Sequence, residues 1–255
     1  MPHPFGSLPS VSRPLPARPP RRTTAEPSPD LRAKALEVHR RLGVVYGVPI
    51  PYFHSLDPLS ELVSSLLSHR TRNAESGRAF KALRGRFTDW SDVPAADTSE
   101  IEALIRGVTW PELKAPRIQA VLREVIARHG APSLDFLADM APDAARAWLA
   151  AIPGVGPKTS AAVLSFSTLR MPALPVDSHH HRVAQRLGLV GDKVAVGPAH
   201  EILRAQLPAD WSAQDLYDNH EVLMLHGQKV CHFRAPACGR CVLLDLCPTG
   251  QARGA

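Results

Sequence analysis

All four cysteines of the chain lie within residues 231–247, in the spacing C-x6-C-x2-C-x5-C. They are Cys231, Cys238, Cys241 and Cys247. Zinc and iron–sulfur clusters prefer thiolate ligands, and four thiolates in so short a segment can close around one compact metal centre. Zinc sites usually join two C-x2-C pairs across a longer spacer, whereas one such pair flanked by single cysteines suits a cubane held by one loop. The spacing predicts a metal centre and leaves zinc open beside iron–sulfur.

Two arginines, Arg234 and Arg240, stand between these cysteines. A loop that is fixed at four points and presents guanidinium groups is a rigid platform for phosphates. The alternative is that both arginines only solvate an exposed loop.

A second candidate site lies in residues 152–159, which read Ile-Pro-Gly-Val-Gly-Pro-Lys-Thr. Gly154 and Gly156 can take backbone angles that are closed to other residues, which allows a tight turn and the close approach of a phosphate. Pro157 suits the first turn of a helix, and the unpaired N–H groups of the turn and the helix start form an anion site. A generic connection between two helices is the alternative. The predicted helix, hairpin and helix span 143–150, 152–156 and 157–169.

Two ionisable residues near this hairpin are candidates for catalysis. Lys158 lies in the first turn of the predicted helix, where the positive end of the helix dipole favours a neutral amine. A neutral amine can attack an electrophilic sugar carbon and form a Schiff base, although a phosphate contact is the simpler role for one lysine. Asp177 precedes another predicted helix and suits its N-cap. A carboxylate fixed in this way can stabilise an oxocarbenium-like sugar or assist deprotonation of the lysine.

Helical periodicity extends through most of the chain from Leu31 onward. Asp57-Pro58 opens a helix with an apolar face, and no sustained alternation of a strand appears. The sequence therefore predicts an all-α fold of about ten short helices. Besides those already given, they cover 74–86, 99–106, 112–129, 178–187, 198–206 and 212–227. Neighbouring residues on a helix face different ways, so the run His179 to His181 is not expected to be a metal site.

The composition favours a folded protein with a polyanionic partner. The 255 residues, of which 44% are hydrophobic, suffice for one large domain or two modest ones. Lys and Arg number 30 against 24 Asp and Glu, a net charge of +6, which indicates nucleic acid or an anionic membrane face unless it reflects only a basic tail. Residues 1–30 are rich in proline and arginine, so we expect a disordered basic arm that either contacts phosphates or is merely solvated.

No apolar stretch is long enough to cross a membrane, and the N-terminus lacks the apolar core of a signal peptide. We therefore expect a cytoplasmic, nucleoid-associated protein without membrane contact. Cysteines are normally reduced in that compartment, so they are expected to bind metal rather than to form disulfides.

Three motifs occur together with the cysteine segment: Gly-Val-Gly-Pro-Lys-Thr at 154–159, Val-Asp-Ser-His at 176–179 and Leu-His-Gly at 225–227. In this order the motifs resemble the endonuclease III family over about residues 31–250. The resemblance implies a two-lobed helix-hairpin-helix DNA glycosylase fold. Its six-helix barrel domain would span 52–170, and its iron–sulfur domain would combine 31–51 with 171–255, with DNA bound between the two.

The resemblance also implies roles for single residues. Lys158 would be the Schiff-base lysine and Asp177 the catalytic aspartate. The four cysteines would hold a structural [4Fe–4S] cluster. The residues that we expect to contact DNA are Gly154, Val155, Gly156, Thr159, Arg70, Trp110, His179 and Arg234.

The implied function is base-excision repair by a bifunctional DNA glycosylase and AP lyase. Such an enzyme would remove damaged bases, by family default oxidised pyrimidines, from double-stranded DNA. It would then cleave the abasic site by β-elimination through the lysine. The expected partner is duplex DNA with a damaged base or an abasic site, and the expected oligomeric state is a monomer.

Two departures from the family pattern affect damage recognition. The family usually has Leu-Leu-Ser-Ala-Gln with an aspartate three residues after the glutamine, whereas residues 66–73 place Arg70 at the glutamine and Asn73 at the aspartate. The second departure is Trp110-Pro111, where the family has a Gly-[Leu/Phe]-Tyr turn. Trp110 would either wedge between bases or belong to the core.

Several alternative functions are open beside this one, and the first follows from these departures. One is a divergent paralogue with weak or narrowed glycosylase activity that acts mainly as an AP lyase. Another is a non-catalytic damage-binding module, which would need neither Lys158 nor Asp177. A monofunctional glycosylase generally lacks a lysine at this position, and a zinc-binding nucleic-acid protein would lack the visible absorbance of iron–sulfur.

Overall fold

The computed structural model describes residues 26–254, and in that range every regular element is a helix. The predicted all-α class is confirmed, whereas most of the predicted basic arm lies outside the described residues. No helix between residues 26 and 254 is long and apolar enough to cross a membrane. The α-helices are α1 (Pro29–Tyr46), α2 (Pro58–Ser68), α3 (Asn73–Arg86), α4 (Thr98–Leu104), α5 (Pro111–His129), α6 (Pro142–Ala150), α7 (Pro157–Phe166), α8 (Ser178–Arg186), α9 (Val196–Arg204), α10 (Ala213–Lys229) and α11 (Pro248–Gln251).

Helix starts follow the capping residues of the sequence. The side chain of Asp57 accepts the N–H of Ser60 at the start of α2, and Ser212 forms a capping box with Asp215 at the start of α10. One predicted helix end is wrong, because the helix expected over 157–169 stops at Phe166. The chain there turns back through a left-handed residue, Arg170, whose φ is 46°.

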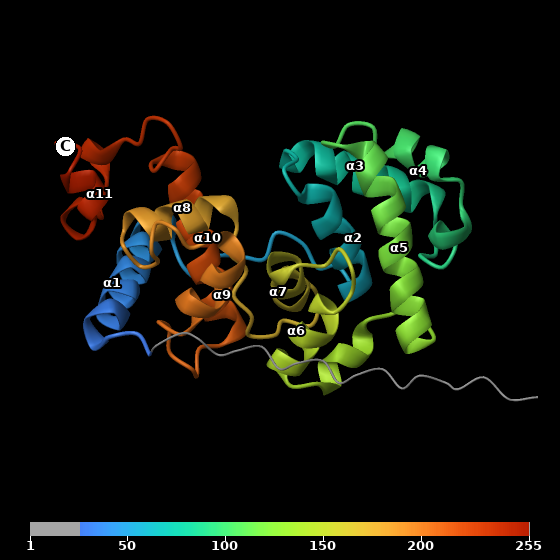
Figure 1. The fold of residues 1–255 in the computed structure, drawn as a ribbon, viewed down its shortest axis with the longest axis horizontal. Helices are drawn as coiled ribbons and strands as arrows, with labels where there is room; N and C mark the ends of the chain where they lie inside the picture. Colours follow the sequence, from blue (N-terminus) through green and yellow to red (C-terminus); the bar gives the residue numbers. More distant parts are fainter. Residues whose placement is uncertain (1–25, 255) are drawn as a thin grey trace, which may run out of the picture.

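The buried apolar side chains form two main cores. The helices around these cores fall into the two groups that Figure 1 shows side by side. One core lies among α2 to α7, which we call the hairpin lobe, and its residues fall between 59 and 173. The other joins α1 to α8, α9 and α10, and we call this part together with α11 the cysteine lobe. The predicted domain bounds of 52–170 and of 31–51 with 171–255 stay a prediction about folding units.

A small aromatic cluster connects the two lobes. Phe166, at the end of α7, packs edge to face against Tyr217 of α10, with ring centroids 5.6 Å apart. Tyr52, in the segment that crosses between the lobes, lies 4.1 Å from Tyr217 by ring centroids. This contact sets the position of α7 relative to the cysteine lobe.

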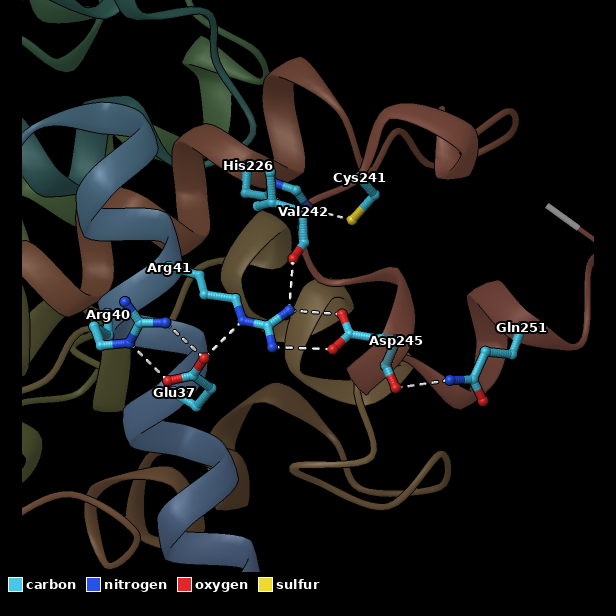
Figure 2. Close-up of polar contacts among 8 residues, drawn as sticks. All are labelled: Glu37, Arg40, Arg41, His226, Cys241, Val242, Asp245 and Gln251. Carbon is cyan, nitrogen blue, oxygen red and sulfur yellow. Dashed lines mark hydrogen bonds and ion pairs between the residues drawn. The ribbon is translucent and has the colours of Figure 1, made fainter.

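The N-terminal helix is fastened to the cysteine segment by an ion pair (Figure 2). Arg41 of α1 donates to both carboxylate oxygens of Asp245, at 2.6 and 2.9 Å, and to the carbonyl oxygen of Val242 at 3.0 Å. Glu37 accepts from Arg40 and from Arg41, and these hydrogen bonds lower the pKa of Glu37 to about 2. Helix α1 therefore supports the segment that contains Val242 and Asp245, near the C-terminal end of the described residues.

Candidate active site

The hairpin between α6 and α7 presents Lys158 at the start of α7. Gly154 has φ of 93°, a conformation that other residues rarely adopt, so its predicted conformational role is confirmed. A Cβ on Gly154 would also lie 3.4 Å from side-chain carbons of Arg117 in α5. The same expectation is wrong for Gly156, whose φ of −95° is open to any residue. A Cβ there would meet no atom within 4 Å, which leaves space beside the helix start.

Val155 differs from its predicted role as a DNA contact. Its side chain is buried in the core of the hairpin lobe. Its N–H donates to the carbonyl oxygen of Ile152 at 3.0 Å and is not free for an anion. The structure therefore assigns Val155 to the core. Thr159, beside Lys158, is partly exposed.

The amine of Lys158 is partly buried between the lobes. Burial lowers its pKa, because loss of solvent disfavours the ammonium form, and the negative charges of Glu61 and Asp177 offset this lowering only in part. Glu61 is itself buried in α2, where it accepts the hydroxyl of Ser65 at 2.9 Å and pairs with His54. These surroundings favour the neutral, nucleophilic amine.

Asp177 is the N-cap of α8, as predicted. Its carboxylate accepts the N–H of His179 at 2.9 Å and the N–H of His180 at 2.7 Å. Burial acts to raise the pKa of Asp177. The charge of His220, the hydrogen bond from the N–H of His180 and the charges of His180 and His179 together outweigh burial, so the pKa is lowered. The carboxylate is therefore ionised at neutral pH, with its oxygens fixed by the helix.

The surroundings of Asp177 include three buried ionisable groups for which the sequence predicted no role at the site. Burial lowers the pKa of His180 to about 3 and that of His220 to about 4, so both imidazoles are neutral at pH 7. Their ring centroids lie 5.7 Å apart. Burial and the charge of Asp177 raise the pKa of Glu221 to about 7. Asp177 is therefore the group in this cluster whose negative charge is secured by hydrogen bonds.

Helix α8 connects Asp177 to the cysteine segment. Arg182 donates to the Nδ1 of His179 at 3.1 Å, to the carbonyl oxygen of Gly227 at 2.7 Å and to that of Cys231 at 3.0 Å. One turn later, Arg186 donates to the carbonyl oxygens of residues 232 and 233. The ring of the predicted DNA contact His179 is thus held by Arg182.

The four cysteines are free thiols that line one pocket together with His226 and Arg186. Three of the sulfurs have hydrogen-bond donors or partners nearby, which suits thiolate ligands. Arg186 donates to Cys231 Sγ at 3.2 Å, the N–H of Gly250 donates to Cys247 Sγ at 3.3 Å, and Cys241 Sγ lies 3.4 Å from His226 Nε2 (Figure 2). Within residues 26–254, no three His, Cys, Asp or Glu side chains form a site for a single metal ion. Arg234 lies exposed on the same segment.

Arg70 and Trp110 lie together at the surface of the hairpin lobe. The guanidinium of Arg70 is 5.6 Å from the centroid of the Trp110 ring, a distance suited to a cation–π contact. Trp110 is 43% exposed, so its interpretation as a core residue is wrong. Both residues have positive φ, 52° for Arg70 and 56° for Trp110.

The turn that contains Arg70 lies in a cluster of positive charge. The pKa of the neighbouring His69 is lowered first by burial and then by four surrounding cations, which are Lys114, Arg70, Lys158 and Arg117. This places the turn on the same side of the lobe as Lys158. Such a cluster is suited to bind a polyanion.

Comparisons with known proteins agree with the fold. The family model described as "HhH-GPD superfamily base excision DNA repair protein" matches residues 63–209. Endonuclease III of Bacillus subtilis is 30% identical over 198 residues, which cover 77% of this chain and 84% of the relative. Endonuclease III of Thermotoga maritima is 30% identical over 199 residues, which cover 78% and 86%.

A solved structure of a trapped covalent intermediate of endonuclease III with DNA superposes with a TM-score of 0.74 at 24% identity. The match covers 88% of this chain and 99% of that chain. This likeness shows a shared fold and confirms the predicted two-lobed helix-hairpin-helix architecture.

The contact between α8 and α10 predicts a difference between two glycines. A Cβ on Gly227 would lie 2.9 Å from the Cβ of His179 and 3.1 Å from its carbonyl oxygen, whereas a Cβ on Gly77 in α3 would meet nothing within 4 Å. Gly227→Ala should therefore lower the free energy of unfolding by about 1–3 kcal/mol through overpacking. Gly77→Ala should leave it unchanged or raise it by about 0.5–1 kcal/mol, because alanine is the better helix former. Urea unfolding of both variants measures the difference, and equal effects would contradict the close contact.

Proposed function

Because this chain belongs to the HhH-GPD superfamily of base excision DNA repair proteins, we propose that Lys158 is the nucleophile of its DNA glycosylase and AP lyase reaction. The main support is the position of Lys158 at the hairpin, where burial lowers the pKa of its amine beside the ionised Asp177. DNA binding by a helix and hairpin alone requires neither a neutral amine nor a fixed carboxylate. The non-catalytic alternative leaves both features without a role.

The first chemical step replaces the base by the lysine. The damaged nucleotide is rotated out of the duplex so that its C1′ becomes accessible. The neutral amine of Lys158 forms a bond to C1′, and the bond between C1′ and the base breaks, so that the base leaves with its electron pair and takes up a proton. The carboxylate of Asp177 stabilises the positive charge that develops on the sugar. It keeps its charge because two backbone N–H groups hold it.

The second step cleaves the strand. The lysine adduct opens the sugar to an imine, which makes the C2′ proton acidic. Loss of that proton expels the 3′ phosphate by β-elimination, and water then releases Lys158 from the product. The reaction needs no oxidant or dissolved cofactor, because every electron pair that forms a bond comes from the amine, the sugar or water.

The substrate in this proposal is duplex DNA that contains an abasic site or a damaged base, with oxidised pyrimidines as the first bases to examine. The guanidinium groups of Arg70 and Arg117 near His69 support a site for the phosphate backbone, since they lie on the side of Lys158. Gly154 provides the tight turn at the hairpin, and the open space at Gly156 allows a phosphate to approach the start of α7.

We further propose that the four cysteines hold a [4Fe–4S] cluster with a structural role. The set of four thiols in one pocket, with N–H donors from Arg186 and Gly250 to two of the sulfurs, fits such a group. Ligation would tie residues 231–247 into one rigid segment. Arg182 and Arg186 bind that segment to α8, so the position of Asp177 depends on it.

The catalytic assignment is tested by borohydride trapping on duplex DNA with a single abasic site. Wild type should form a covalent adduct and Lys158→Ala should form none, because only an imine can be reduced to a stable bond. Asp177→Asn should slow trapping by about 10²–10⁴-fold, since the amide cannot supply the negative charge. The exposed Lys193→Ala should trap like wild type. A wild-type protein that binds this DNA but never traps would instead indicate a monofunctional glycosylase or a binding module.

The cluster is tested by the visible spectrum and the iron content of the purified protein. Iron–sulfur gives broad visible absorbance and zinc gives none. Cys238→Ser should lose both absorbance and iron, whereas Arg240→Gln, which alters a side chain of the same segment that is no ligand, should keep both. Zinc without iron in the wild-type protein would contradict the cluster.

A further inference from the structure

Lys114 of α5 is 5% exposed, and its ammonium group lies among neutral oxygens. It donates to the carbonyl oxygen of Leu67 at 2.6 Å, to that of His69 at 2.8 Å and to the hydroxyl of Thr71 at 2.8 Å. Burial and the charge of Arg117 lower its pKa to about 8. All three acceptors belong to the end of α2 and the turn after it, where helix carbonyl groups have no partner within the helix. A buried amine thus fixes the turn that contains Arg70.

The same turn is bonded to the turn before α5. The N–H of Thr109 donates to the hydroxyl of Thr71 at 3.1 Å, and the hydroxyl of Thr109 donates to the carbonyl oxygen of Arg70 at 2.9 Å. The Thr71 hydroxyl therefore accepts from both Lys114 and Thr109. These hydrogen bonds make the two turns one rigid unit, although they are about 40 residues apart in sequence.

The rigid unit carries two exposed side chains, Arg70 and Trp110, on backbone conformations that must be stabilised by surrounding contacts. Arg70 and Trp110 both have left-handed backbone angles, which residues other than glycine rarely adopt. The guanidinium of Arg70 lies over the Trp110 ring. Together they form a flat, cationic stack at the surface, and such a stack can replace a base in a duplex and contact the phosphates beside it.

We propose that Lys114 is a positioning residue, which holds the stack of Arg70 and Trp110 in the orientation that fills the duplex when the target nucleotide leaves it. This inference rests on the proposed function. Two long side chains that are already ordered lose less conformational entropy on binding, so more of the binding energy is available for extruding the nucleotide. Lys114 itself remains buried behind the turn and contacts no substrate.

The proposal separates two kinds of DNA. In a continuous duplex, the extruded abasic nucleotide leaves an unpaired base on the complementary strand and a gap that the stack fills. If the complementary strand is interrupted so that it lacks the nucleotide opposite the abasic site, no orphaned base remains for the stack to contact. The chemistry at Lys158 is the same in both. Single-turnover trapping rates on the two DNAs therefore separate positioning of the stack from support of the catalytic lysine.

Wild type should trap both DNAs. Lys114→Met keeps the length of the buried chain but removes its three donors, and it should slow trapping about tenfold or more on the continuous duplex, with little change on the interrupted one. Thr109→Val removes one hydroxyl at the surface of the unit and should show the same selective loss in weaker form. Lys81→Met, at an exposed lysine of α3, is the matched control and should behave like wild type on both.

Equal losses on the two DNAs in Lys114→Met would overturn the proposal, because the lysine would then support the whole site. No loss on either DNA would overturn it as well. If Lys114→Met does not fold, as judged by thermal unfolding, the selectivity of Thr109→Val decides in the same way. Failure of wild type to trap either DNA would instead overturn the proposed function.

Discussion

The hydrogen bonds from the first turn of α8 to the carboxylate of Asp177 are the constraint on which the site depends. They fix the position and the charge of this carboxylate, because an ionised oxygen is the best acceptor for two N–H groups at a helix start. From the same helix, Arg182 and Arg186 bind the cysteine segment. The close approach at Gly227 fixes α8 against α10. Helix α8 therefore both supports the cysteine segment and places the carboxylate of Asp177.

The proposed chemistry requires a neutral amine at Lys158 beside an ionised carboxylate at Asp177. Lys158 moves toward the neutral amine because it loses solvent. Asp177 stays ionised because the nearby His220 and the hydrogen bond from the N–H of His180 outweigh its own loss of solvent. The buried histidines around Asp177 remain neutral at pH 7. Lys158 at the start of α7 lies close enough to Asp177 at the start of α8 for the two charges to interact, and neither lobe alone would provide both groups.

Features that depend on local sequence could be predicted, whereas features that depend on contacts between distant segments could not. Capping residues and periodicity predicted the helix starts and the cap at Asp177. The prediction for Gly156 was wrong because a sequence shows which angles glycine permits and not which angles it adopts. Val155 was assigned to the phosphate site although its side chain fills the core. No role was predicted for Lys114, since its acceptors lie 43 to 47 residues earlier in the chain.

The central claim is that the amine of Lys158 forms the covalent bond to DNA. The most direct measurement is the mass of the peptide to which the sugar remains attached after borohydride reduction and digestion of the adduct. The account predicts that the sugar fragment is found on the peptide that contains Lys158 and on no other. Attachment at any other amine, such as that of the buried Lys114, would contradict it.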